Sequence, residues 1–332
     1  MIDRITFQIQ DYNLDELKKR LPLDKPMSVN QETGDINKGG HLRNLSLIIS
    51  ASGELWLKNS LHKYAKGGYN YDPFTPKEAQ EAIIEIHKTL GIPLANFIVT
   101  SIEIGVNIQM SEDPMKYINT IRYYDKTYRF IRMKPLYKTS KIKGVSCSLS
   151  EYEIKFYDKT FHAKHRKSRA EQAKVRDNIL CYEIEFSSKQ SFMLGFKDFK
   201  PYRATKYPLT AEHLLNPRFY SRFIRLLRQI FYKIKFHDIE ADYSKFKSPD
   251  EVKQYIFALS EEYQYYLDYL KEYKGEKEFR KEVRANDNFL KKKEPFKNSR
   301  YENELKEKFE KTMSEMIDAK LSSNEIKELL IL

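Results

Sequence analysis

Two alternating segments in the middle of the chain, YEIKFYDK at residues 152–159 and CYEIEF at residues 181–186, decide the fold. In both segments polar and apolar residues take turns, which is the period-two pattern of β-strands with one buried face. In the second segment Tyr182, Ile184 and Phe186 fall on one face, whereas Glu183 and Glu185 fall on the other. The pattern therefore predicts two strands that present polar side chains on one face of a sheet.

A third strand is predicted over residues 102–108, where Glu103 and Asn107 alternate with four aliphatic residues. If the three strands pair in one sheet, carboxylates, lysines and a tyrosine gather on one polar face. Such a face is found in metal-dependent phosphoryl-transfer sites. It is also found on ordinary solvated sheets, and the strand pattern leaves both interpretations open.

The composition is that of one large domain, or of one domain with an appendage, in a chain of 332 residues of which 41% are hydrophobic. No window approaches the roughly 18 consecutive apolar residues of a membrane span, so no membrane association is expected. Residues 1–7 read as a strand and not as a signal peptide. Cys147 and Cys181 are interpreted as reduced core thiols of a cytoplasmic protein, with a single disulfide as the alternative.

Positive charge is concentrated in the middle of the chain. Residues 122–235 contain 27 Lys and Arg against 10 Asp and Glu, a net charge of +17, while the rest of the chain carries −5. A basic segment rich in aromatic residues suits a polyanion, because Lys and Arg contact phosphates while aromatic rings stack on unpaired bases. Nucleic acid is therefore the expected partner, and a membrane surface is the weaker alternative.

Several stretches within or near this segment are candidate DNA contacts. Residues 115–143 mix basic and aromatic residues and include Arg129 and Arg132, and the loop after the first central strand includes Arg166 and Lys167. Lys155 lies on the polar face of that strand. His62, in the run SLHKY at residues 60–64, is a metal ligand, a phosphate contact or a structural residue.

Two helical regions follow from the pattern of apolar residues and capping signals. TPKE at residues 75–78 has a Thr N-cap, a Pro at the first helical position and a capping-box Glu, so a helix begins there and ends at Gly91. A second helix is predicted from Pro217 to about Lys235. One side of this helix is apolar. Its other side carries the cationic residues and one tyrosine, a candidate DNA-facing surface: Arg218, Arg222, Arg225, Arg228 and Tyr232.

These elements predict an α+β fold with a central antiparallel sheet and packed helices. The character of the chain changes to charged helix near residue 248. We therefore expect a nicking or DNA-binding domain at residues 1–245 and a helical C-terminal extension at residues 246–332.

The order of four motifs resembles the replication initiators of single-stranded-DNA phages and rolling-circle plasmids, of the filamentous-phage gene II and plasmid Rep-trans types. The motifs are SLHKY at 60–64, TSIEIGVNI at 100–108, FYDK at 156–159 and LCYEIE at 180–185. The resemblance covers roughly residues 1–240. The chain lacks the His-hydrophobic-His pair of the better-known nucleases of this kind.

The resemblance implies a relaxase-like sheet that binds one divalent cation, Mg²⁺ or Mn²⁺, and a tyrosine that attacks a phosphodiester to leave a 5′-phosphotyrosine. Glu103 and Glu183 would be metal ligands, with Asp158 and Glu185 as weaker candidates, and Lys159 would contact phosphate. For the nucleophile, family spacing favours Tyr220 and helix phase favours Tyr232, with Tyr157 or Tyr202 next. The implied partners are a single-stranded or hairpin DNA origin and the helicase and polymerase of a bacterial host.

A rolling-circle replication initiator that nicks DNA and transfers the strand is therefore the function expected from the sequence. The alternatives are a non-catalytic single-stranded-DNA or origin-binding protein and a structural phage protein. The charge distribution is common to the first two, and only the first needs the acidic residues of the polar sheet face.

Overall fold

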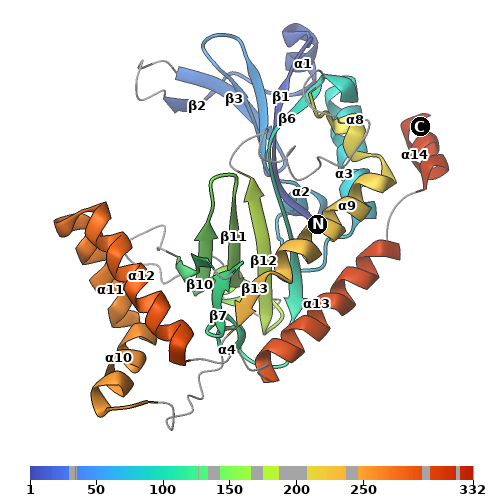
Figure 1. The fold of residues 1–332 in the computed structure, drawn as a ribbon. Coiled ribbons are helices and arrows are strands. Elements are labelled where there is room, and N and C mark those ends of the chain that lie inside the picture. Colours follow the sequence, from blue (N-terminus) through green and yellow to red (C-terminus); the bar gives the residue numbers. More distant parts are fainter. Residues whose placement is uncertain are drawn as a thin grey trace.

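The computed structural model describes residues 1–29, 34, 36–125, 127–133, 143–165, 175–186, 208–236, 246–293, 300–318 and 322–331. These residues form an α+β fold around a large antiparallel sheet, as the sequence predicted (Figure 1). The sheet has ten strands in the order β2-β3-β4-β5-β1-β6-β12-β11-β10-β9. A second, three-stranded sheet has the order β13-β7-β8.

The strands of the large sheet are β1 (Ile2–Ile9), β2 (Lys25–Val29), β3 (Ile36–Leu42), β4 (Leu45–Ile49), β5 (Leu55–Ser60), β6 (Phe97–Gln109), β9 (Ile131–Arg132), β10 (Gly144–Ser148), β11 (Tyr152–Asp158) and β12 (Ile179–Phe186). Those of the small sheet are β7 (Ile121–Tyr124), β8 (Tyr128–Arg129) and β13 (Ile234–Phe236). The described helices are α1 (Leu14–Arg20), α2 (Leu61–Ala65), α3 (Pro76–Leu90), α4 (Pro114–Ile118), α5 (Lys159–His165), α8 (Ala211–Leu214), α9 (Pro217–Phe231), α10 (Pro249–Leu259), α11 (Glu261–Tyr269), α12 (Glu276–Lys293), α13 (Arg300–Asp318) and α14 (Ser323–Ile331).

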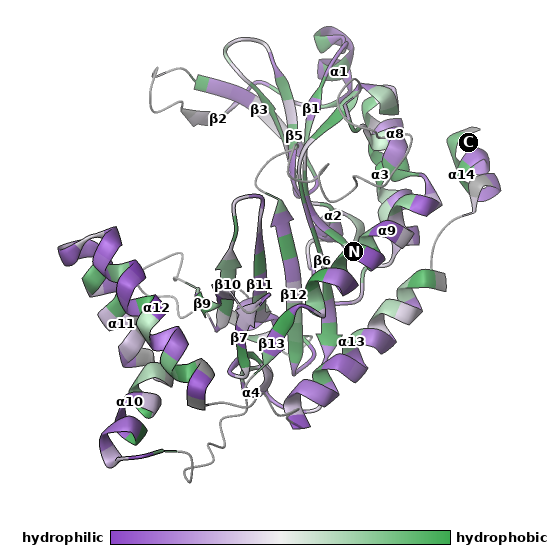
Figure 2. Ribbon diagram, viewed as in Figure 1, coloured by the Kyte–Doolittle hydropathy of each residue, from purple (hydrophilic) through white to green (hydrophobic). Residues whose placement is uncertain are grey.

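The three predicted central strands are neighbours in the sheet, in the order β6-β12-β11. Their register pairs Lys155 with Glu183 and Glu183 with Gly105. Directly paired residues point to the same face of a sheet, and side chains alternate along each strand. The acidic residues of β6 and β12 therefore share one face with the polar residues of β11. Figure 2 shows hydrophilic and hydrophobic residues alternating along β12.

The opposite, apolar face of these strands packs against helices. The ring of Tyr182 lies edge-on to Phe231 of α9 and to Phe309 of α13, and its hydroxyl donates to the carbonyl of Leu227. Phe231 and Phe309 stack with their ring centroids 3.9 Å apart. In Figure 1 α3, α9 and α13 lie together on one side of the sheet. Helix α9 thus covers the face that turns away from Glu183.

The helix predicted to follow Thr75 forms as α3, with both hydrogen bonds of the capping box present. Gly91 ends it in the left-handed conformation, with φ of 68°, which glycine adopts without strain. The predicted arginine-bearing helix forms as α9 but ends at Phe231, so Tyr232 is its C-cap and not part of its helical face.

The C-terminal region is helical, as expected, but it does not form one separate unit. Helices α10 to α12 pack in small clusters of their own, around Tyr255 and Leu290 and around Tyr263 and Leu267. Helix α13 instead returns to the sheet, where Leu305, Phe309 and Met313 are fully buried in the main core. A division at residue 245 therefore does not follow the hydrophobic cores. None of the described helices is long and apolar enough to span a membrane.

Candidate metal centre

Three carboxylates converge on the polar face of the central strands. One ligand atom from each of Asp3 on β1, Glu103 on β6 and Glu183 on β12 lies within 4.8 Å of the others. Glu103 and Glu183 are buried, with 6% and 3% exposed, and 12% of the Asp3 side chain is exposed. The sequence predicted the pairing of Glu103 with Glu183 and missed Asp3.

Asp3 joins this group because β1 is irregular at that residue. Ile2 pairs with Ile104 and Arg4 pairs with Glu103, so Asp3 is an extra residue between two registers. A bulge of this kind turns the extra side chain to the face on which regular alternation would not place it. Regular alternation groups Asp3 with the buried Ile5 and Phe7. An acidic residue at an apolar position was the signal in the sequence.

The position of Glu183 depends on the absence of a side chain at Gly105. A β-carbon at Gly105 would lie 2.5 Å from Cγ of Glu183 and 2.5 Å from the carbonyl oxygen of Tyr182. Contacts this short do not occur between real side chains, so any larger residue would displace Glu183. Gly105 thus gives Glu183 the room to lie across β6 toward Asp3 and Glu103.

Lys159 is the cation nearest to the carboxylates. Its Nζ lies 3.4 Å from Oδ2 of Asp3 and 3.6 Å from Oε1 of Glu183, and the residue is 4% exposed. Burial opposes the ammonium charge, but Cys181 and the surrounding carboxylates together raise the pKa of Lys159 above its usual value. Lys159 therefore stays charged and partly neutralises the three carboxylates.

Tyr157 completes the polar cluster from β11. Its hydroxyl donates to Oε1 of Glu183 over 2.7 Å and accepts from Nζ of Lys159 over 3.0 Å. Oε1 of Glu183 also accepts from the thiol of Cys181 over 3.0 Å. Burial, with Cys181 and the neighbouring carboxylates, raises the pKa of Tyr157 well above its usual value.

The two carboxylates at the centre of the group differ in their electrostatics. Burial and the charge of Glu183 raise the pKa of Glu103 well above its usual value. Burial also acts to raise the pKa of Asp3, yet the Lys159 ammonium and the Ser60 hydroxyl, which donates to Asp3 over 2.7 Å, hold it well below. Close carboxylates that cannot all ionise without a partner are a common property of cation sites.

A loop and a histidine support Asp3. The side-chain amide of Asn70 donates to both carboxylate oxygens of Asp3, over 3.2 and 3.1 Å. His62 lines the same small cavity as Asp3 and Glu183, stacked on Phe74 with ring centroids 4.6 Å apart. Burial lowers the pKa of His62 to about 2, so its ring is neutral. His62 is therefore a buried part of the site and not an exposed phosphate contact.

Of the other predicted ligands, Asp158 lies apart from the three carboxylates, whereas Glu185 pairs directly with Glu103 across the strands but is not one of the three residues whose ligand atoms lie within 4.8 Å of one another. Asp158 caps α5, where its Oδ1 accepts from the backbone N–H of Phe161 over 2.8 Å. Glu185 forms an ion pair with Lys155 on the same face. Lys155 also lies 3.5 Å from Glu153, so it is held between carboxylates and is not a free DNA contact.

The predicted nucleophiles on α9 are not brought to the carboxylates. Tyr220 is fully buried, its ring edge-on to that of Phe223, in the core on the far face of the sheet. Tyr232 is 50% exposed, and its hydroxyl donates to Glu310 of α13 over 2.9 Å. Tyr220 belongs to the helix that packs against Tyr182, the neighbour of Glu183 that points the other way, and Tyr232 is the C-cap of that helix. Of the tyrosines named from the sequence, Tyr157 is the one at the site, while Tyr202 lies outside the described residues.

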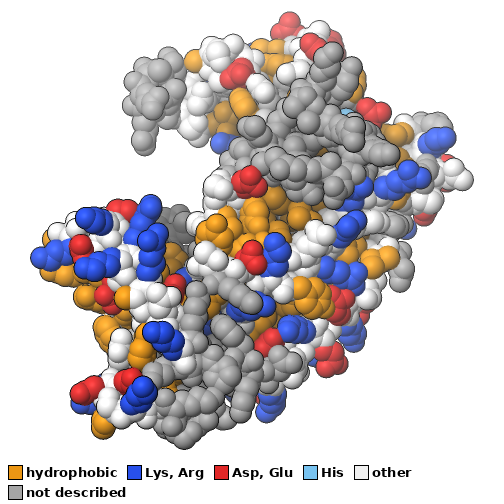
Figure 3. Space-filling view, in the orientation of Figure 1, with side chains coloured by type: hydrophobic (Ala, Val, Ile, Leu, Met, Phe, Trp, Pro, Cys, Tyr) orange, Lys and Arg blue, Asp and Glu red, His pale blue; other side chains and the backbone are white. Residues whose placement is uncertain are grey.

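The predicted DNA-contacting cations differ in their exposure and in their partners. Arg129 is largely buried, where it donates to the carbonyl of Ala258 over 3.0 Å and lies 3.6 Å from Asp287, so it anchors the C-terminal helices. Arg132 is half-buried, and Arg228 pairs with Glu310 over 2.6 Å. The remaining arginines of α9 comprise the half-buried Arg222 and the exposed Arg218 and Arg225, whereas Arg166 and Lys167 lie outside the described residues. Figure 3 shows acidic side chains among the Lys and Arg side chains on the face of the molecule that it draws.

A polar groove missed by the sequence analysis borders the site. It has a volume of about 250 Å³ and is lined by residues of β1, β4, β5, β6 and β12, including Arg4, Lys58, Asn59, Glu103 and Glu185. Arg4 and Lys58 are exposed and have no ion-pair partner among the described residues. The groove therefore offers two unpaired cations beside the carboxylates.

The sequence matches no protein-family model, and no curated protein matches it significantly.

Proposed function

We propose that this protein is a metal-dependent DNA-nicking enzyme of the kind that starts rolling-circle replication, and that Tyr157 is its nucleophile. The observation that carries the proposal is the contact of the Tyr157 hydroxyl with Glu183, which shares a buried group with Asp3 and Glu103. A nucleophile, three oxygen ligands and a cation thus lie within a few ångströms of one another.

The three carboxylates fit a hard divalent cation. Carboxylate oxygens are the preferred ligands of Mg²⁺ and Mn²⁺, and three from one buried site leave further positions for water and phosphate. When bound, such a cation would polarise the phosphate and oppose the carboxylate charge that now raises the pKa of Tyr157. Asp3, Glu103 and Glu183 would hold it, with Asn70 and Ser60 orienting Asp3.

The residues of the site can carry the transfer step. The Tyr157 phenol gives its proton to Glu183, and the phenolate oxygen bonds to phosphorus. The bond between phosphorus and the 3′-oxygen breaks, and that oxygen leaves with the electron pair and takes a proton from water. The Lys159 ammonium, 3.0 Å from the Tyr157 oxygen, stabilises the negative charge that develops on the attacking and equatorial oxygens. The products are a 5′-phosphotyrosine and a free 3′-hydroxyl that a host polymerase could extend.

The groove that contains Arg4 and Lys58 is the proposed path for the DNA strand. Its two exposed cations are on the polar face of the sheet and next to Glu103, so a phosphate between them would stand close to the carboxylates. The basic segment at residues 122–235 adds a favourable long-range field for a polyanion.

The proposal is tested by incubating the purified protein with a pool of single-stranded oligonucleotides and Mn²⁺, followed by denaturing electrophoresis. We expect a protein–DNA adduct that needs the cation and is lost in Tyr157→Phe but retained in Tyr232→Phe. An adduct of unchanged yield in Tyr157→Phe would refute the assignment of the nucleophile, and absence of nicking by the unaltered protein would refute the activity.

One specific observation favours a second function, DNA binding without catalysis. The Lys159 ammonium already contacts Asp3 and Glu183, so the carboxylates have a partial partner even without a metal. In a non-catalytic origin-binding protein the same cluster would only stabilise the fold. That function predicts DNA binding that is indifferent to divalent cations and to the Tyr157 hydroxyl.

A further inference from the structure

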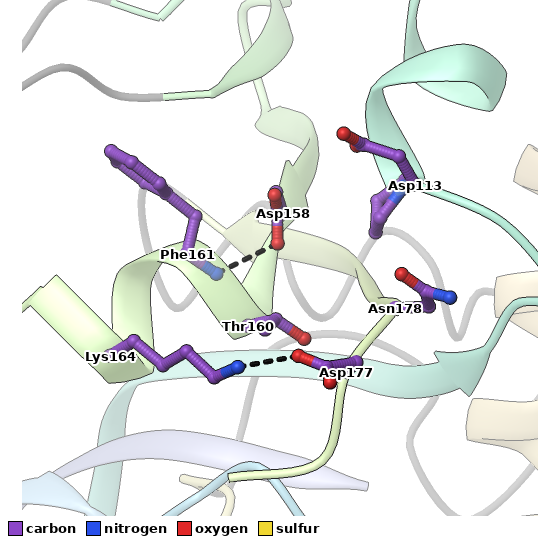
Figure 4. Close-up of a pocket in the computed structure, with 8 residues that line it drawn as sticks. Asp113, Asp158, Thr160, Phe161, Lys164, Asp177 and Asn178 are labelled. Atoms are coloured by element: carbon purple, nitrogen blue, oxygen red, sulfur yellow. Dashed lines mark hydrogen bonds and ion pairs between the residues drawn. The ribbon is translucent and has the colours of Figure 1, made fainter. Parts of the chain in front are cut away.

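A second cavity, of about 420 Å³, lies where β11 ends and α5 begins (Figure 4). It is lined by the start of α4, the end of β11, α5 and the segment before β12, with Asp113, Pro114, Asp158, Phe161, Lys164 and Asp177 among the lining residues. Asp158 follows Tyr157 in the strand and points to the opposite face, so this cavity is separate from the three carboxylates. Both features nevertheless depend on the same short run of residues.

Asp158 is the buried acid of this cavity. It is 5% exposed, and its Oδ1 accepts one hydrogen bond from the backbone of Phe161. Its Oδ2 takes no hydrogen bond from any described residue. Burial and the charge of Asp113 raise the pKa of Asp158, although the Phe161 N–H and the Lys143 and Lys164 ammonium groups act against this rise. A ligand that brings N–H donors to this carboxylate would therefore be stabilised.

The arrangement does not suit a metal ion. Asp113 and Asp177 are exposed at the rim, where Asp113 caps α4 through the backbone N–H of Met115 and Asp177 pairs with Lys164 over 2.5 Å. Among the described residues, it is Asp3, Glu103 and Glu183 that bring three ligand atoms within 4.8 Å of one another. The cavity is also far larger than an ion requires.

We propose that this cavity binds the guanine base of an unpaired nucleotide in the DNA strand. Guanine presents two adjacent donors, N1–H and the N2 amino group, and a carboxylate can accept from both. Pro114 supplies apolar wall for the base, while the ring of Phe161 points away from Asp113 and Asn178 (Figure 4). The inference rests on the proposed function in so far as DNA is the partner.

The surroundings of the cavity suit a nucleotide rather than a free base. The Lys143 ammonium lies 5.0 Å from the centroid of the Phe161 ring, and Lys164 stands at the rim. These cations can contact the phosphates that flank an inserted base. A base held here would bind the strand at the end of β11 and would make the choice of nicking position depend on sequence.

The test is fluorescence anisotropy with labelled thymidine oligonucleotides of about 12 nucleotides that carry one central dG, dI or dA, in EDTA. Inosine lacks only the N2 amino group, so we expect dG to bind about tenfold more tightly than dI and dA. Asp158→Asn should remove this preference, because its amide would meet the base with N–H groups while its oxygen still caps α5. Asp250→Asn on α10, an exposed residue that does not line the cavity, is the control and should keep the preference.

Equal affinity for the dG and dI oligonucleotides would overturn the proposal, as would a dG preference that survives in Asp158→Asn. A preference for dA that Asp158→Asn removes would overturn guanine as the ligand. Nicking is scored separately with Mn²⁺, so a dG preference without nicking would refute only the proposed activity. Nicking without any base preference would refute only this inference.

Discussion

The hydroxyl of Tyr157 lies 2.7 Å from Oε1 of Glu183, although the two residues are 26 positions apart in the chain. The antiparallel pairing of β11 with β12 sets this contact, since Tyr157 pairs with Cys181 and so lies diagonal to Glu183 on the same face. If this contact belongs to a cation site that is used for chemistry, changes to the residues around it should alter Mn²⁺ binding, stability and DNA binding.

Replacing Gly105 by alanine should weaken the binding of Mn²⁺ without removing any ligand. The new methyl group would meet Cγ of Glu183 at 2.5 Å and would push it out of the site. We expect at least a tenfold loss of affinity in calorimetric titration, with a stability cost of about 1–3 kcal/mol from the added bulk. Ser101→Ala on the same strand is the control. Unchanged Mn²⁺ affinity in Gly105→Ala would mean that Glu183 is not a ligand.

Removing the charge of Lys159 should make the protein more dependent on a metal. In Lys159→Met the buried carboxylates of Asp3 and Glu183 lose their ammonium neighbour, which costs about 3 kcal/mol in the metal-free protein. A bound dication should restore much of this loss, so the rise in Tm on adding Mn²⁺ should exceed that of the unaltered protein. A smaller rise would show that Lys159 assists cation binding and does not compete with it.

The raised pKa of Glu103 predicts how pH acts on the metal-free protein. Between the ordinary Glu pKa and the raised one, the folded state binds more protons than the unfolded state, so stability falls as pH rises through this window. Glu103→Gln cannot ionise and should lack this decline, which amounts to about 1.4 kcal/mol for each unit of pKa shift. Thermal unfolding in EDTA from pH 5 to pH 8 measures it. With Mn²⁺ the unaltered protein should be the more stable of the two, because it has a carboxylate ligand that Glu103→Gln lacks. Parallel curves for the two proteins in EDTA would contradict the account.

DNA binding should depend on the groove and less on α9. Arg4→Gln and Lys58→Gln should each reduce the slope of log affinity against log salt by about one, since each would lose a phosphate contact. Arg225→Gln, on the helix behind the sheet, is the matched control and should leave the slope nearly unchanged. The reverse result would restore the arginine side of α9 as the DNA-facing surface, as the sequence alone suggested.

The sheet could be read from the sequence because each central strand keeps a strict alternation. The polar phases of Glu103 and Glu183 predicted two of the three carboxylates, since regular pairing preserves the phase from strand to strand. Asp3 could not be found in this way, because the bulge between Ile2 and Arg4 shifts the phase by one residue.

The place of α9 could not be predicted from its own amphipathic pattern. That pattern identifies the buried side of a helix and does not tell which face of the sheet the helix covers. Tyr220 and Tyr232 were therefore natural candidates until Phe231 was seen against Tyr182, on the face opposite to Glu183. The return of α13 to the main core depends on contacts of Phe309 with residues more than 70 positions away, which local periodicity cannot reveal.

The central claim is that Tyr157 becomes covalently attached to DNA in a reaction that needs the carboxylates of Asp3, Glu103 and Glu183. The most direct measurement is mass spectrometry of the peptide that contains residues 152–159, after reaction with a single-stranded oligonucleotide and Mn²⁺ and digestion of both polymers. The account predicts a nucleotide phosphate on Tyr157, absent when EDTA replaces the cation. A modified tyrosine elsewhere in the chain, with an unmodified Tyr157, would contradict it.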